Sequence, residues 1–150
     1  MGKIEIVTEI EAPLEKVFAW NADPKTFEKV STAEADAKVE ITSEGPVGLG
    51  TTFHLSAVMA GQKLEGDMEY VEFEENRRVV QRMTKGDLKK MEMTDIFEAT
   101  DKGTRITTTW DYELPYSVIG KILDRLKVGK EIKASAKAGY QRAKEILEEE

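Results

Sequence analysis

The C-terminal stretch 115–149 constrains the fold most, because it carries the one long helical pattern in the sequence. Pro115 stands at its start, where proline is favoured in helices. Apolar residues then recur on one helix face as far as Leu126 and on a rotated face from Gly129 onward. Glycine weakens a helix interior. We therefore expect a short helix over 116–127, a kink or break at Val128-Gly129 that acts as a hinge, and a longer helix after it.

The second apolar face of this helix is built largely from small residues. Four of its seven members are glycine or alanine; the members are Gly129, Ile132, Ala136, Gly139, Tyr140, Ala143 and Leu147. Small residues let a helix sit close on a sheet, which is one interpretation. In the other, the larger members hold the helix off the sheet and leave a cavity, where small apolar ligands bind.

The residues before the helix alternate with a period near two, which is typical of strands. Residues 3–11 predict one strand. Two short helices should follow, the first beginning near Pro13 and the second after a break that ends at Pro24. Six more strands follow over 32–114, joined by short turns, so we expect an antiparallel meander. Residues 1–150 should form a single domain of the α+β class. A seven-stranded antiparallel sheet would wrap around the long C-terminal helix, with two short helices after the first strand.

Composition excludes several classes of protein. The chain is 40% hydrophobic and 34% charged, with no apolar run near the roughly 18 residues of a membrane span and no signal-peptide core. The absence of cysteine excludes disulfides and thiolate nucleophiles. A net charge of −7 disfavours nucleic acid as a partner and anionic membranes as a docking surface. We expect a cytoplasmic monomer that neither crosses a membrane nor binds nucleic acid.

Local motifs agree with a known order of elements. They are Ala12-Pro13 with Val17-Phe18 and Asp23-Pro24, the glycine-rich turn 45–51, Gly103-Thr104-Arg105-Ile106-Thr107, and Leu114-Pro115. Together with the element order, they resemble the START-like, Bet v 1-like helix-grip superfamily, which includes polyketide cyclase/dehydrase-type proteins. The resemblance implies the helix-grip fold and a hydrophobic cavity. It implies no catalytic set, since the matched residues are turn and core positions, and fold alone does not assign function.

The sequence contains no recognisable catalytic or metal motif. His54 is the one histidine, and it alternates with Phe53 and Leu55, so we expect it on the outer face of its strand. A single histidine without cysteine makes no recognisable zinc site. The serines lie in no nucleophile-elbow pattern. We therefore expect no catalytic residue of these types, no metal and no cofactor.

Asp95 is the exception among the carboxylates, because it shares its strand face with Met93 and Phe97. An inward carboxylate needs a partner or a raised pKa. A β-bulge that turns Asp95 outward, or a plain structural hydrogen bond, would also explain it. Paired with an inward tyrosine such as Tyr70 or Tyr140, it could serve general acid–base chemistry in an enzyme of the cyclase or hydratase kind.

The pattern favours a binding or carrier protein for a hydrophobic small molecule such as a lipid, isoprenoid or polyketide-like compound. Methionine-rich inward positions suit an adaptable pocket, although core packing explains them as well. The predicted cavity residues are Phe53, Leu55, Met68, Tyr70, Gln81, Met83, Met91, Met93, Asp95, Thr108, Trp110, Tyr112, Ile132, Ala136 and Tyr140. Besides the enzyme, a protein–protein adaptor of the co-chaperone type is an alternative. It would need an exposed apolar patch, for which Trp20 and Phe27 are the candidates.

Overall fold

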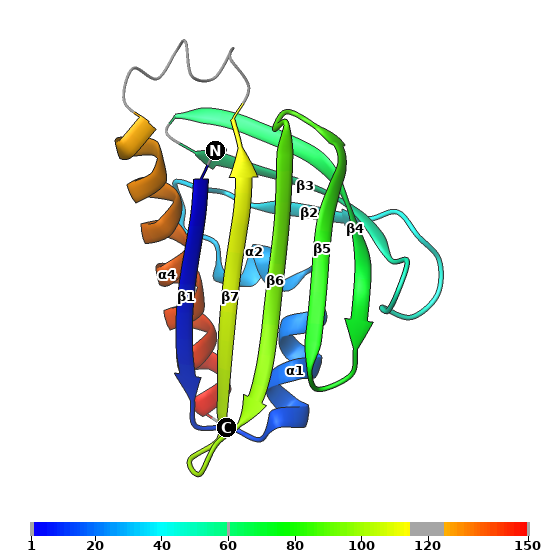
Figure 1. The fold of residues 1–150 in the computed structure, drawn as a ribbon, viewed down its shortest axis with the longest axis vertical. Coiled ribbons are helices and arrows are strands. Elements are labelled where there is room, and N and C mark those ends of the chain that lie inside the picture. Colours follow the sequence, from blue (N-terminus) through cyan, green and yellow to red (C-terminus); the bar gives the residue numbers. More distant parts are fainter. Residues whose placement is uncertain (1, 60, 115–124, 150) are drawn as a thin grey trace.

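The computed structural model of the chain describes residues 2–59, 61–114 and 125–149. Seven strands form one antiparallel sheet in the order β1-β7-β6-β5-β4-β3-β2, and the helices lie on one side of it (Figure 1). This confirms the predicted α+β helix-grip architecture. The elements are β1 (Gly2–Ile10), α1 (Leu14–Ala22), α2 (Thr26–Val30), β2 (Lys38–Ile41), β3 (Thr52–Met59), β4 (Gln62–Glu74), β5 (Arg78–Gly86), β6 (Lys90–Ala99), β7 (Thr104–Glu113) and α4 (Arg125–Glu148).

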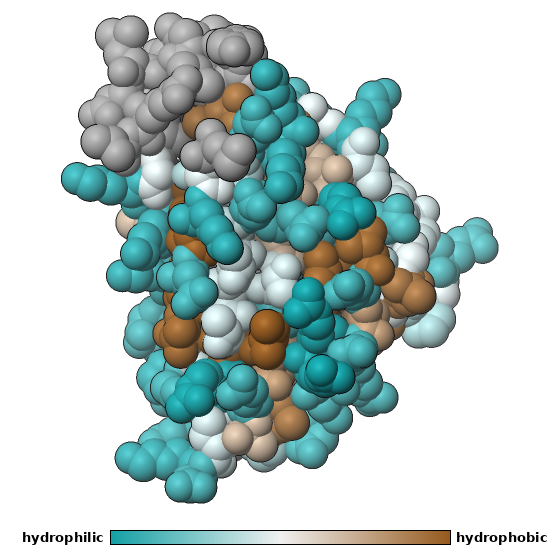
Figure 2. All heavy atoms as spheres, in the orientation of Figure 1, coloured by the Kyte–Doolittle hydropathy of each residue, from teal (hydrophilic) through white to brown (hydrophobic). Residues whose placement is uncertain are grey.

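Side-chain alternation divides the sheet into a buried face and a solvated face. In β6, Met91, Met93, Asp95 and Phe97 are buried, and the residues between them are more exposed. Successive side chains in a strand point to opposite faces, so the apolar parity of the sequence fixes which face the helices cover. Figure 2 shows the opposite face, where hydrophilic side chains predominate around a few apolar patches.

His54 lies on this outer face, as predicted. Its ring nitrogens contact the carboxylates of Asp67 at 2.9 Å and Glu65 at 3.3 Å. The hydrogen bond to Asp67 raises the pKa of His54 most, and the bond to Glu65 raises it further. Within the described part of the chain, no group of three His, Asp or Glu side chains could hold a metal ion.

The sheet bends around the helices at irregular positions in β4. The register between β4 and β5 shifts between Asp67 and Met68 and again between Tyr70 and Glu72. Such bulges increase local twist and bend the bulged strand. Gly66 and Gly86 are Cα partners beside the first shift, and a Cβ on Gly86 would lie 2.6 Å from the Cα of Gly66. Any side chain at Gly86 would therefore force the two strands apart, so this approach requires glycine.

The helix α4 runs beside β1, while α1 and α2 lie behind the middle of the sheet (Figure 1). The predicted second apolar face points inward, since Ile132, Ala136, Ala143 and Leu147 are buried. None of the helices in the described ranges is long and apolar enough to cross a bilayer.

The predicted break in the C-terminal helix is wrong, whereas the kink and the hinge at Gly129 stay predictions. The helix α4 is continuous from Arg125 through Val128-Gly129 to Glu148. One glycine costs a helix only about 1 kcal/mol, which the burial of several apolar residues on the same helix outweighs. The rest of the predicted short helix, up to residue 124, lies outside the described residues, and so does the start predicted at Pro115.

Candidate functional site

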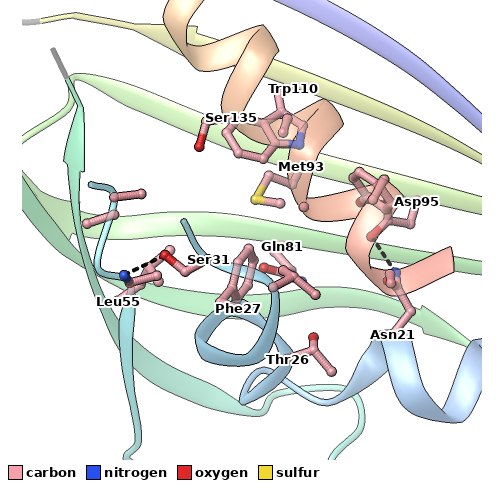
Figure 3. Close-up of a pocket in the computed structure, with 18 of the residues that line it drawn as sticks. Asn21, Thr26, Phe27, Ser31, Leu55, Gln81, Met93, Asp95, Trp110 and Ser135 are labelled. Atoms are coloured by element: carbon pink, nitrogen blue, oxygen red, sulfur yellow. Dashed lines mark hydrogen bonds between the residues drawn. The ribbon is translucent and has the colours of Figure 1, made fainter. Parts of the chain in front are cut away.

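A cavity of about 130 Å³ lies between the inner face of the sheet and the helices (Figure 3). Its lining combines four parts of the chain that lie far apart in the sequence. The sheet contributes Leu55, Ala57, Val58, Gln81, Met91, Met93, Asp95 and Trp110; α4 contributes Ser135, Ala136, Gly139, Tyr140 and Ala143; the two short helices contribute Trp20, Asn21, Thr26, Phe27 and Val30; the loop after α2 contributes Ser31, Ala35 and Ala37. The wall is therefore mostly apolar and carries a few polar groups, which is the usual composition of a small-molecule site.

The cavity lies beneath the small residues of α4. Ala136, Gly139 and Ala143 all line it, whereas Leu147, one turn past Ala143, is buried outside it. At Gly139 the helix approaches α2, because a Cβ there would lie 3.4 Å from a methyl carbon of Val30. Small side chains thus leave the space open on the helix side, while Leu147 of the same face packs into the core.

A wider outer pocket of about 570 Å³ adjoins the cavity. The two spaces share Ala35, Val58, Trp110 and Ser135 as lining residues. The outer pocket continues past Gly61 and along the N-terminal half of α4. A ligand could therefore place one end in the inner cavity and extend its remainder along the outer pocket.

Asp95 forms the polar corner of the cavity. Its Oδ1 accepts hydrogen bonds from the hydroxyl groups of Thr108 at 2.5 Å and Tyr140 at 2.9 Å. Its Oδ2 accepts a longer bond from the Asn21 amide at 3.4 Å (Figure 3). The register of β6 with β5 and β7 is regular at this position, so the alternative of an outward β-bulge is wrong. The three donors come from β7, α4 and α1, so the carboxyl group ties both helices to the sheet.

Burial governs the ionisation of Asp95 and Tyr140. The Asp95 side chain is buried and all three of its donors are neutral. Burial raises the pKa of Asp95, and the hydrogen bonds from Thr108, Tyr140 and Asn21 offset part of that rise. Burial and the adjacent Asp95 carboxylate raise the pKa of Tyr140 well above its usual value. Tyr140 therefore remains a hydrogen-bond donor to Asp95 at neutral pH.

The contribution of Asp95 to the stability of the protein should increase as the pH falls toward the acid range. Since its pKa is higher in the folded than in the unfolded state, its contribution is greatest below the unfolded value of about 3.9. That contribution is lost as the pH rises through the folded pKa. In Asp95→Asn, the amide oxygen keeps the bonds from Thr108 and Tyr140 without a buried charge. The variant should match the wild type in acid and melt several degrees higher at pH 7.

The measurement is thermal melting of both proteins between pH 4 and 8. His54 and Glu148, whose pKa values are also shifted, are present in both proteins, so the difference isolates Asp95. A difference in melting temperature that does not change with pH would contradict this assignment.

The residues predicted for the cavity occupy three different places. Those that line it are Leu55, Gln81, Met91, Met93, Asp95, Trp110, Ala136 and Tyr140. Ile132 lines the outer pocket instead. Phe53, Met68, Tyr70, Met83, Thr108 and Tyr112 point to the same side of the sheet but belong to the packed core or its margin. Among them Thr108 reaches the site indirectly, through its bond to Asp95.

Tyr70 illustrates why an inward position need not line the cavity. Its hydroxyl donates a hydrogen bond to the backbone carbonyl of Ala22, the last residue of α1. Burial raises the pKa of Tyr70 far above its usual value. Of the two tyrosines considered as partners of Asp95, Tyr140 therefore makes the contact, and Tyr70 anchors α1 to the sheet.

The short helices and the loop after them form a side of the cavity that was not predicted from the sequence. Trp20, Asn21 and Phe27 line it, together with Ser31 and Ala35 of the following loop. Trp20 and Phe27, the candidates for an exposed adaptor patch, are instead partly buried against the core, so they do not form such a patch. The aromatic character of Trp20 and Phe27 was the one sign in the sequence that these residues could line a cavity. Without the position of α1 and α2 over the sheet, that signal could not be assigned to a cavity.

The sheet wrapped around α4, together with the cavity beneath this helix, defines a helix-grip fold. A family model described as polyketide cyclase / dehydrase and lipid transport matches residues 1–148, and the chain belongs to this family. No curated protein sequence matches the chain.

Solved structures with the same fold include TTHA0849 from Thermus thermophilus, at 24% identity and a TM-score of 0.76, covering 95% of this chain and 97% of that one. The Zhui aromatase/cyclase from Streptomyces sp. R1128 is 16% identical, with a TM-score of 0.77 and coverage of 98% and 93%. A START superfamily protein from Mycobacterium smegmatis is 14% identical, with a TM-score of 0.77 and coverage of 98% and 97%. At these identities the similarity concerns the fold.

Proposed function

We propose that this protein binds or carries a small, predominantly apolar molecule in the cavity between the sheet and α4. The observation that carries the proposal is the mostly apolar cavity beneath Ala136, Gly139 and Ala143. Protein interiors are normally packed without voids of this size, so a cavity of about 130 Å³ that adjoins an outer pocket is unusual for a core. The family description, which includes lipid transport, supports the same class of function.

The dimensions favour a ligand with a compact end and a longer remainder. An engineered apolar cavity of roughly 150 Å³ accepts benzene, so the inner cavity has about the size of one ring. The outer pocket of about 570 Å³ lies within the range of small-molecule sites. Lipids, isoprenoids and polyketide-like compounds all fit this description.

Ligand binding is tested by native mass spectrometry of the purified protein and by calorimetry with small alkylbenzenes and alkylphenols. We expect a complex of one molecule per chain and dissociation constants in the micromolar range or below. Retention of a molecule from the expression host would identify the ligand class directly. The proposal is wrong if no compound of this kind binds and the cavity stays closed to all of them.

Catalysis is a second candidate function, and the Asp95 corner is the observation that favours it. The Oδ2 atom of Asp95 receives only the long contact from Asn21, and the pKa of this buried carboxyl is raised. A carboxylate of this kind can take a proton from a bound molecule as a general base. Deuterium exchange at the α-carbon of bound propiophenone would test this. Exchange above the background rate that disappears in Asp95→Asn supports an enzyme. Exchange at the background rate supports a protein that binds its ligand without catalysis.

A further inference from the structure

Two polar atoms in the cavity wall lack a partner within the described part of the chain. They are the Oε1 acceptor of Gln81 and the Nε1–H donor of Trp110, and both are buried. Buried polar groups in folded proteins are nearly always hydrogen-bonded, and leaving one unpaired destabilises the protein. Two such groups in one cavity wall indicate positions where a bound molecule completes the hydrogen bonding.

The strand register places these atoms on either side of Met93. Gln81 of β5 is the Cα partner of Met93 in β6, and Met93 is the Cα partner of Trp110 in β7. Neighbouring strands lie about 4.8 Å apart, so the backbones of Gln81 and Trp110 are separated by roughly 10 Å. All three side chains point toward the space that Phe27 faces from α2 (Figure 3). One acceptor and one donor therefore border the same ring-sized space.

The charges around the cavity restrict the ligand further. Among the described residues that line it, Asp95 is the one ionisable side chain besides Tyr140, and no lysine, arginine or histidine is present. An anionic group would enter a low-dielectric space beside a carboxyl group and without a cation to pair with. A neutral group would meet no such penalty.

We propose that the end of the ligand held in the inner cavity is a neutral, ring-sized group bearing a carbonyl or hydroxyl oxygen. A carbonyl oxygen accepts a hydrogen bond from Trp110 Nε1–H, and a hydroxyl group donates one to Gln81 Oε1. Carboxylates and phosphates stay outside the inner cavity. This inference rests on the proposed binding function and specifies which end of the ligand the cavity recognises.

Four compounds of nearly equal size test the inference by calorimetry at pH 8. Propylbenzene offers no polar atom, propiophenone can only accept a hydrogen bond, 4-propylphenol can accept and donate, and 4-propylbenzoate is an anion. A net hydrogen bond of average strength corresponds to a few-fold to tenfold change in affinity. We expect the ketone and the phenol to bind about 5- to 10-fold more tightly than propylbenzene, and the benzoate at least about 10-fold more weakly than the phenol.

Three variants assign these preferences to single atoms. Trp110→Phe removes the N–H donor and should abolish the preference for the ketone over propylbenzene. Gln81→Met removes the acceptor, so it should reduce the preference for the phenol over propylbenzene. The preference for the ketone over propylbenzene should stay unchanged. Trp20→Phe is the matched control, because Trp20 also lines the cavity but its ring nitrogen is not a buried, unpaired donor. It should change the affinities for ketone and propylbenzene alike.

A second measurement separates recognition from a structural role. If Gln81 serves the ligand, Gln81→Met removes an unpaired buried acceptor, and the free protein should melt a few degrees higher. A lower melting temperature would show that Gln81 stabilises the fold, which contradicts the inference. Equal affinities for all four compounds would overturn the inference and leave the binding function intact. Failure of every compound to bind would overturn both.

Discussion

Replacing Ala136 by phenylalanine should reduce the affinity for small apolar ligands by at least about 100-fold while the protein stays folded. Ala136 lies on the buried face of α4 and borders the inner cavity. A phenyl ring is about the size of the benzene molecule that a cavity of roughly 150 Å³ accepts, so the new side chain would occupy the space of about 130 Å³ itself. Calorimetry with 4-propylphenol measures the loss.

A surface substitution on the same helix provides the control for this experiment. Gln141→Phe adds the same ring at an exposed position that does not line the inner cavity, and it should leave the affinity within about twofold. An enlarged side chain in a fully packed core destabilises a protein by about 1–3 kcal/mol. The free energy of unfolding of Ala136→Phe therefore shows whether the new ring enters open space or a packed core. A large loss of stability with unchanged ligand affinity would show that the cavity is not the binding site.

Phe53→Ala should destabilise the protein by about 3–5 kcal/mol, which is the usual cost of removing a buried phenyl ring. Phe53 is fully buried, and its ring lies 5.9 Å from that of Tyr70 and 6.2 Å from that of Phe27. The substitution removes the contact through which β3 supports α2 and leaves a void that the surrounding rings cannot fill. Denaturant unfolding monitored by circular dichroism measures the free-energy difference.

Leu55→Ala is the matched comparison, two residues along the same strand and on the same face. Leu55 is only partly buried and lines the existing cavity, so its removal enlarges a space that is already there. The truncation breaks fewer packing contacts and should cost less than about 2 kcal/mol. Equal losses of stability at Phe53 and Leu55 would mean that the inner face is packed uniformly, which would contradict its division into core and cavity.

The sequence was sufficient to predict the sheet, its antiparallel order and the face covered by the helices. Those features depend on local alternation, and the apolar parity of β6 even placed Asp95 on the inner face. The continuity of α4 through Gly129 could not be read in the same way. Glycine propensity is a weak local term, and the tertiary packing that outweighs it is not visible in the sequence.

The division between core and cavity could not be predicted from the sequence. Phe53 and Leu55 share a strand face, yet the ring of Phe53 packs among aromatic side chains and Leu55 borders open space. The difference arises from the bulges of β4 and the placement of α1 and α2, which are three-dimensional features. The unpaired atoms of Gln81 and Trp110 could not be predicted either. Whether a buried polar atom finds a hydrogen-bond partner depends on which residues lie next to it in the folded structure.

NMR of the methionine methyl groups shows directly whether a ligand enters the inner cavity. Met91 and Met93 line the inner cavity, whereas Met68 is fully buried in the core and Met83 lies at its margin. In a titration with 4-propylphenol, the methyl signals of Met91 and Met93 should shift and saturate together at one ligand per chain, while those of Met68 and Met83 stay nearly constant. Unchanged signals at Met91 and Met93, or equal shifts at all four methionines, would contradict binding in this cavity.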